Sequence, residues 1–128
     1  MKKTSSVGHE SADWLADLFD SVDALDTSRF VGFLARDAEF RFGSAPGVKG
    51  HEQIGAAVDD FFSSIAGCSH HIANTWRGDG TIACEGEVTY HRHDGSRISI
   101  PFANVFEMAG GLISGYKIYI DIAPLYAG

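Results

Sequence analysis

The sequence has few cysteines, few basic residues and no long apolar run, and each shortage excludes a class of protein. Cys68 and Cys84 are too few for a disulfide framework and lack CxxC spacing, so both are expected to be reduced. Lys and Arg number 10 against 17 Asp and Glu, and the formal net charge of -7 leaves no basic face for nucleic acid. No apolar segment follows the N-terminal lysines, and no apolar run is long enough to span a membrane. We therefore expect neither a signal peptide nor a membrane span, and we expect the protein to be cytoplasmic.

The chain has 128 residues, which is close to the commonest size of one domain. No repeat, linker or low-complexity segment divides it. We therefore expect a single domain over residues 1–128, with a disordered N-terminus over residues 1–9.

The C-terminal part predicts a long β-hairpin. Apolar residues alternate at period two from Arg97 to Met108, Ala109-Gly110-Gly111 breaks the run, and β-forming residues resume from Leu112 to Ile122. Neither strand can bury an apolar face alone, so the sheet must curl around the helical material of the N-terminal half.

The remaining elements follow from apolar spacing and turn residues. Helical spacing begins near Ser11, and hairpin turns are expected at Gly78-Asp79-Gly80 and Asp94-Gly95. The predicted helices are Ser11–Leu25, a short one from Phe30 that ends near Arg36-Asp37, and His51–Ile65, and the other predicted strands are Ala38–Phe42, His70–Arg77 and Thr81–His93. This order predicts an α+β cone in which helices cover the concave face of a bent antiparallel sheet, with a small-ligand site at the open end.

Asn104 is the first candidate for that site. It falls in phase with Phe102 and Phe106, where an unsatisfied buried amide costs roughly 1–3 kcal/mol. A partner within the fold or a ligand must therefore satisfy it.

His70 is the second candidate, on a predicted strand face shared with Ile72 and Asn74. Its imidazole is either a core side chain bonded to the backbone or a general base oriented by a carboxylate. An Asp at the end of a helix, such as Asp23, is often only solvated or capping. Asp121 is either an acid in the pocket or a strand end at the solvent.

Aromatic side chains are expected mainly in the core, namely Trp14, Phe19, Phe33, Phe40, Phe62, Trp76 and Phe106. Those expected to contact a ligand at the open end are Trp14, Phe19, Phe42, Phe62, Phe106 and Tyr119. His91 and His93 have the spacing of two metal ligands, but no third ligand is evident and no glycine fingerprint follows a strand. We therefore expect neither a metal nor an organic cofactor.

Four runs occur in an order that resembles the nuclear transport factor 2-like superfamily, and its SnoaL-like branch most of all: LDTSRFVGFLARDAEFRFG, VKGHEQIGAAVDDFF, SHHI and YKIYIDIAPL. The resemblance implies a cystatin-like cone, also called an α+β barrel, and a homodimer. The superfamily includes ketosteroid isomerases, polyketide cyclases, limonene epoxide hydrolases, scytalone-type and bile-acid-type dehydratases, and members that only bind or dimerise.

The resemblance also implies roles for individual residues. The base and the oxyanion Tyr of ketosteroid isomerases are replaced by Phe42 and Leu18. The Asp, His and Asn of scytalone-type dehydratases correspond to Asp23, His70 and Asn104, so the resemblance implies that Asp23 is the carboxylate partner of His70. A second His and a Tyr of those dehydratases correspond to Thr89 and Val22, and the late Asp of SnoaL-like cyclases to Asp121.

The resulting hypothesis is a cofactor-free lyase or isomerase that uses a His-Asp general base on a small apolar, oxygenated, ring-sized molecule. The alternative is a non-catalytic domain of the same fold that binds a ligand or dimerises.

Overall fold

The computed structural model describes residues 6–127, with side chains described from Trp14 onward. The helices are α1 (Ser6–Asp23), α2 (Thr27–Val31), α3 (Gly50–Ser63) and α4 (Ala123–Tyr126), and the strands are β1 (Leu34–Phe42), β2 (Val48–Lys49), β3 (Gly67–Gly78), β4 (Thr81–His91), β5 (Arg97–Ala109) and β6 (Leu112–Ile120).

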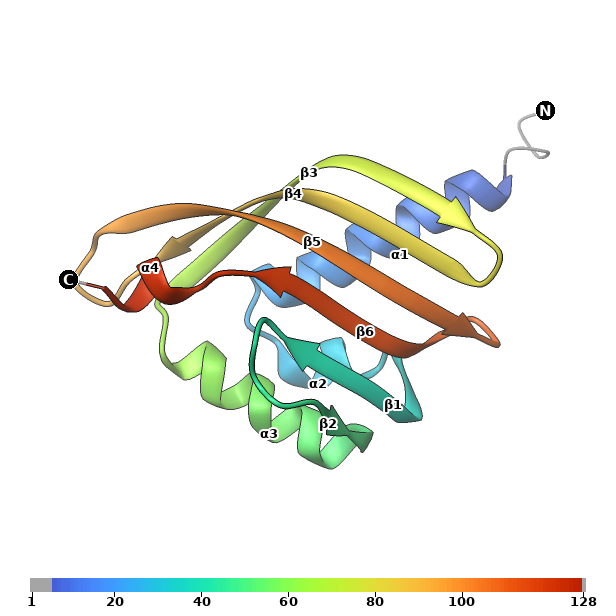
Figure 1. Cartoon of the computed structure of the whole chain (residues 1–128), viewed down its shortest axis with the longest axis horizontal. Coiled ribbons are helices and arrows are strands. Elements are labelled where there is room, and N and C mark those ends of the chain that lie inside the picture. Colours follow the sequence, from blue (N-terminus) through green and yellow to red (C-terminus); the bar gives the residue numbers. More distant parts are fainter. Residues whose placement is uncertain (1–5, 128) are drawn as a thin grey trace.

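The strands form one curled sheet in the order β2-β1-β6-β5-β4-β3. All neighbouring pairs are antiparallel except β1 and β6, which run parallel. Figure 1 shows α1 crossing behind β3, β4 and β5, while α2 and α3 lie beside β1 and β2. The structure thus confirms the predicted α+β class and the packing of helices on a bent sheet.

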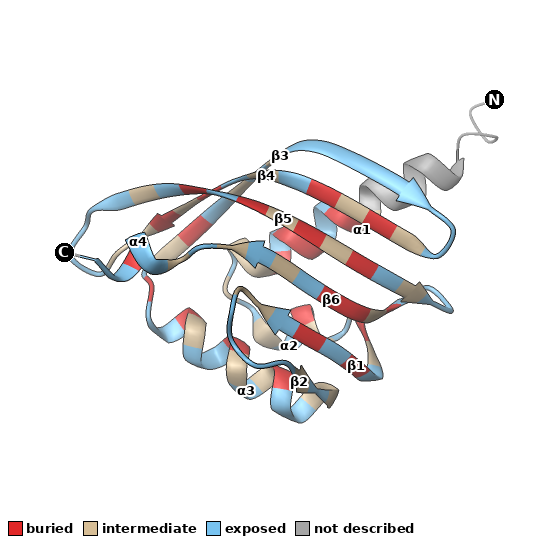
Figure 2. Ribbon diagram, in the orientation of Figure 1, coloured by how far each residue is buried: buried red, intermediate tan, exposed pale blue. Residues whose placement is uncertain are grey.

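Alternation along the strands separates the two faces of the sheet. Buried and exposed positions alternate along β4, β5 and β6 in Figure 2, and the buried ones meet the apolar stripes of α1 and α3. In α1 that stripe contains Leu15, Leu18 and Phe19, while Asp17 and Asp20 are exposed, as the helical spacing predicts. The concave face therefore supplies the core.

Several boundaries differ from the sequence-based prediction. The helix α1 begins at Ser6 rather than near Ser11, and residues 1–5 lie outside the described part. The second helix ends at Val31 rather than near Arg36, and β1 begins at Leu34. The two-residue strand β2 was not predicted, because so short a run carries no periodicity.

A β-bulge interrupts the regular pairing of β3 with β4. The register with β4 shifts between Ile72 and Asn74, opposite Gly86. A Cβ atom on Gly86 would lie 1.9 Å from the carbonyl oxygen of His71, so only glycine lets the two strands approach this closely.

The bulge also overturns two predictions. Asn74 does not share the buried face of His70, because the extra residue turns it to the outer face, where its Nδ2 donates to Glu85. Trp76 is likewise not in the core but 55% exposed. None of the described helices is both long enough and apolar enough to cross a membrane.

Candidate functional site

A mostly apolar cavity lies between the concave face of the sheet and the helices α2 and α3. Its volume is about 190 Å³. Ala45 and Pro46, both exposed in the β1–β2 loop, form part of its rim. The hydrogen-bonding and thiol side chains in its wall are few: Cys68, His70, Tyr90, Asn104 and Tyr116. A small number of polar groups in an apolar wall is typical of a small-ligand site.

The end of α1 brings Asp23 beside Cys68 and His70, which line this cavity. Leu25 adopts a left-handed conformation with φ of 54°, and its N–H donates to Val22 O while that of Asp26 donates to Ser21 O. These bonds end the helix in a Schellman arrangement. Asp26 then caps α2 by accepting from the N–H of Arg29. The chain reverses here, and Asp23 is left facing β3.

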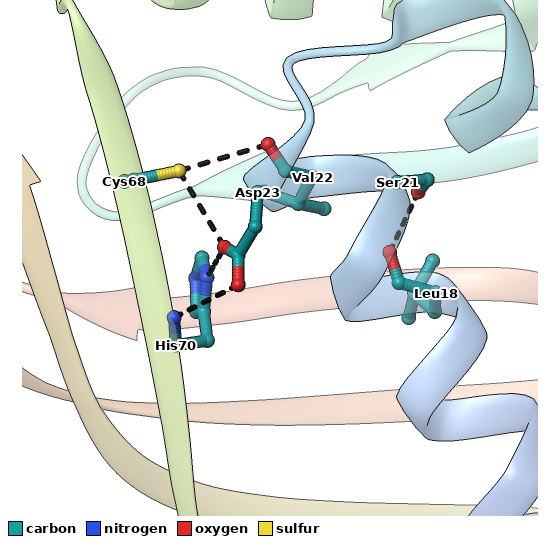
Figure 3. Close-up of polar contacts among 6 residues, drawn as sticks. All are labelled: Leu18, Ser21, Val22, Asp23, Cys68 and His70. Atoms are coloured by element: carbon teal, nitrogen blue, oxygen red, sulfur yellow. Dashed lines mark hydrogen bonds and ion pairs between the residues drawn. The ribbon is translucent and has the colours of Figure 1, made fainter.

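Asp23 and His70 are joined by two hydrogen bonds (Figure 3). Oδ1 of Asp23 lies 2.6 Å from Nδ1 of His70, and Oδ2 accepts from the backbone N–H of His70 at 3.0 Å. The imidazole is further held by aromatic rings, with ring-centre distances of 4.9 Å to Phe19 and 5.3 Å to Phe102. Both the position and the orientation of the ring are thereby fixed.

This arrangement selects the tautomer of His70. A carboxylate only accepts hydrogen bonds, so Nδ1 carries the proton and Nε2 of the neutral ring is an acceptor. The His70 side chain is only 10% exposed and lines the cavity. Nε2 is therefore the nitrogen left to take a proton from a ligand.

Cys68 is a further partner of Asp23 that the sequence analysis did not assign to the site. It lies two residues before His70 on the same face of β3, and its Sγ is 3.6 Å from both Asp23 Oδ1 and Val22 O. Burial, followed by the charge and the hydrogen bond of Asp23, raises the pKa of the thiol to about 12. Cys68 is therefore a protonated thiol at neutral pH, and both cysteines are free, as predicted.

Asp23 occupies an unusual place for an anion. The C-terminal end of a helix carries partial negative charge, which disfavours a carboxylate by roughly 0.3–1 kcal/mol. Donors from His70 and Cys68 offset this cost. A carboxylate at the last residue of a helix is the signal in the sequence that supports a role beyond solvation.

Asn104 lies on β5 in the wall of the cavity and is 2% exposed. Its Oδ1 is buried and, among the described residues, has no hydrogen-bond partner. It is next to Phe102 on the same strand face, and Phe102 contacts the ring of His70. Asn104 therefore offers an unsatisfied polar group to whatever occupies the cavity.

Tyr90 and Tyr116 are cavity-lining residues that the sequence analysis missed. Both are buried and line the cavity, and burial raises the pKa of each phenol. Each lies in phase with apolar residues of its strand. The same test that identified Asn104 could have found them.

The other predicted site residues differ in whether they line the cavity. Phe42 and Phe62 line the cavity, whereas Trp14, Phe19, Phe106, Tyr119 and Asp121 do not. Trp14 packs edge-on against Phe106 in the core, and Phe19 stacks behind His70. Tyr119 is 58% exposed, on the outer face.

Asp121 is not brought to His70. Its side chain is exposed, and its Oδ1 accepts from the backbone N–H of Ala123 at the start of α4. Of the two interpretations of Asp121, the geometry matches the strand end at the solvent.

Metal-ligating side chains converge at one place in the described part of the chain. Asp23, Cys68 and His70 each offer one ligand atom, and these atoms lie within 4.8 Å of one another. His91 and His93 form no such group there, and Nε2 of His93 lies 3.1 Å from Ser63 O.

The chain belongs to the SnoaL-like domain family, which matches residues 15–116. No curated protein sequence matches it. The family match confirms the resemblance on which the sequence analysis relied.

Solved structures share the fold at low sequence identity. A candidate SnoaL-like polyketide cyclase from Jannaschia sp. CCS1 is 16% identical, with a TM-score of 0.76 over 89% of this chain and 87% of that one. An NTF2-like protein of unknown function from Burkholderia pseudomallei K96243 is 14% identical, with a TM-score of 0.78 over 87% of this chain and 90% of that one. A LEH-like epoxide hydrolase from M. tuberculosis is 14% identical, with a TM-score of 0.71 over 84% of this chain and 80% of that one.

Proposed function

We propose that the protein is a cofactor-independent lyase or isomerase in which His70 abstracts a proton from a small oxygenated ring compound. The observation that carries this proposal is the pair of hydrogen bonds that His70 donates to Asp23, which leaves Nε2 as the free ring nitrogen in a mostly apolar cavity. Membership of the SnoaL-like family and the likeness to a candidate polyketide cyclase and an epoxide hydrolase support a small-molecule enzyme.

In the proposed reaction, Nε2 takes a proton from a carbon next to a carbonyl or a leaving group. The imidazolium that forms is stabilised by the Asp23 carboxylate. Negative charge grows on the substrate oxygen, and Asn104 is the residue proposed to hold it. Half a turn of the amide exchanges Oδ1 and Nδ2, so Asn104 presents an acceptor to a hydroxyl or a donor to an oxyanion.

The size of the cavity limits the substrate. An apolar cavity of about 150 Å³ accommodates a benzene ring. The cavity here, of about 190 Å³, therefore matches a molecule with one ring and short substituents. Tyr90 and Tyr116 supply two further hydroxyls for oxygen atoms on such a ring.

Exchange of carbon-bound protons tests the proposal before any product is identified. Ring ketones and hydroxylated aryl ketones are incubated with the protein in D₂O, and NMR follows deuterium entering the carbon next to the carbonyl. We expect exchange that His70→Ala lowers by about 10²–10⁴-fold. His71→Ala, which alters the exposed neighbouring histidine, is the matched control.

The alternative function predicts a different outcome of the same assay. A ketone that shifts the His70 imidazole signals on binding, yet exchanges at the buffer rate, would support a non-catalytic ligand-binding domain and contradict the proposed chemistry.

The proposal includes a homodimer formed through the outer face of the sheet, in a cytoplasmic protein. Trp76 and Tyr119 are exposed on that face, and the strand register places Ala83, Ala103 and Val105 between them. An apolar patch of this kind commonly marks an interface.

A further inference from the structure

We infer that Asp23, Cys68 and His70 form a binding site for a thiophilic divalent cation of the Zn²⁺ class, and that its occupancy switches off the His70 base. Nothing in the proposed reaction needs this ion. The second half of the inference rests on the proposed function, whereas the binding site itself does not.

The ligand chemistry suits zinc. Thiolate, imidazole nitrogen and carboxylate oxygen are the three ligand types that zinc takes from proteins, at about 2.3, 2.0 and 2.0 Å. The side chains of Cys68 and His70 lie on one face of β3, and both approach the same oxygen, Oδ1 of Asp23 (Figure 3). A hard cation such as Mg²⁺ would not select a site with a thiol.

The distances are close to those of a tetrahedral site. Two donors at zinc bond lengths lie about 3.3–3.5 Å apart in tetrahedral geometry. Sγ of Cys68 is already 3.6 Å from Oδ1 of Asp23. Nδ1 of His70, at the 2.6 Å of a hydrogen bond, would move away by less than about 1 Å.

The surroundings supply the rest of such a site. Cys68 and His70 both line the cavity, which gives the ion a path of entry and leaves its fourth position to water. Oδ2 of Asp23 remains bonded to the backbone N–H of His70, which keeps the carboxylate in place.

Zinc binding would change the protonation of two side chains, His70 and Cys68. Zinc takes the place of the proton on Nδ1, and the neutral ring then carries its proton on Nε2. The thiol of Cys68 releases its proton to the solvent, so one proton is released per ion. With a proton already on Nε2, His70 cannot accept another from a substrate.

The thiol makes the affinity depend on pH. Because zinc binds the thiolate and displaces the thiol proton, the apparent zinc affinity should rise between pH 7 and pH 9. A site formed by surface histidines alone would show little change over this range.

Cobalt reports the thiolate ligand without any substrate. Co²⁺ is titrated into the metal-free full chain at pH 8.5, followed by competition with Zn²⁺. We expect a sulfur-to-cobalt charge-transfer band in the near ultraviolet, displaced by zinc and absent in Cys68→Ala. Cys84→Ala, which removes a second buried cysteine outside the cluster, keeps the band, as does His93→Ala. No band in the wild type, or a band that survives Cys68→Ala, would overturn the site.

The proton-exchange assay tests the switch separately. Zinc should abolish exchange in the wild type and inhibit Cys68→Ala at least tenfold more weakly. Zinc that leaves exchange unchanged while the cobalt band is present would overturn the switch. A cobalt band in a protein that catalyses no exchange would contradict the proposed function and leave the metal site standing.

Discussion

Asp23 holds His70 at two points, because its Oδ1 accepts from the ring Nδ1 at 2.6 Å and its Oδ2 from the backbone N–H at 3.0 Å. One carboxylate thus fixes the ring against the strand that carries it. The contact joins residues 47 positions apart, at the end of α1 and near the start of β3. The proposed chemistry depends on this contact.

Asp23→Asn should lower the rate of proton exchange by about 10²–10⁴-fold with little loss of ligand affinity. The amide of Asn keeps an oxygen for the backbone N–H of His70, but its NH₂ favours the tautomer with the proton on Nε2. Rates and dissociation constants are measured in parallel on wild type and variant. Equal rates would show that Asp23 does not orient the base.

Asn104→Leu should raise stability while it lowers activity. The substitution replaces an amide whose buried Oδ1 is unsatisfied by an apolar side chain of similar volume, a gain of about 1–3 kcal/mol. The loss of the group that holds the substrate oxygen should cost about 10²–10³-fold in rate. Urea unfolding and the exchange assay measure the two effects. A variant that is less stable than the wild type would show that Asn104 is satisfied in the folded protein.

Gly86→Ala should destabilise the protein by about 1–3 kcal/mol, because the new Cβ would collide with the backbone at the bulge. The adjacent strand carries His70, so the exchange rate should fall as well. Gly78→Ala is the matched control, since its Cβ would meet nothing within 4 Å. Thermal unfolding compares the two. Equal melting temperatures would contradict the role given to the bulge.

Folding stability should decline as the pH rises from 8 to 10. Burial raises the pKa of Cys68 and of Cys84 from 9.0 to about 12, so their contribution to stability is complete below pH 9 and is lost as pH rises toward 12. The loss by pH 10 is about 1 kcal/mol per thiol. The double variant Cys68→Ala/Cys84→Ala should show a flatter dependence of the unfolding free energy on pH, measured by urea unfolding. An unchanged dependence on pH would show that the buried thiols are not its cause.

The double variant Trp76→Glu/Tyr119→Glu should convert the proposed dimer to a monomer. Two new carboxylates on each protomer place four negative charges at the centre of the symmetric interface. Sedimentation velocity at tens of micromolar compares variant and wild type. A wild type that sediments as a monomer would exclude the dimer.

Patterns among residues close in sequence predicted most of the helices and strands. Apolar spacing predicted α1 and α3, and glycine turns predicted the three hairpins, where Gly80, Gly95 and Gly110 have positive φ. These features depend on residues that are close in sequence. The parallel pairing of β1 with β6 depends on contacts across the whole chain, which no local pattern reports.

The site was harder to predict for the same reason. Asn104 was identified because it interrupts an apolar strand face, and Asp23 and His70 because they match a family pattern. Cys68 looks like an ordinary buried cysteine until α1 places a carboxylate beside it. The bulge that exposes Asn74 and Trp76 has no signal in β3 itself, because its cause, Gly86, lies on the neighbouring strand.

The tautomer of His70 decides whether this residue can serve as the base, and no substrate is needed to measure it. Long-range ¹H–¹⁵N NMR of the metal-free protein above the titration of the ring distinguishes the two nitrogens. We predict a proton on Nδ1 and a free Nε2 in the wild type, and the reverse in Asp23→Asn. A proton on Nε2 in the wild type would leave His70 unable to act as the base and would contradict the proposed chemistry.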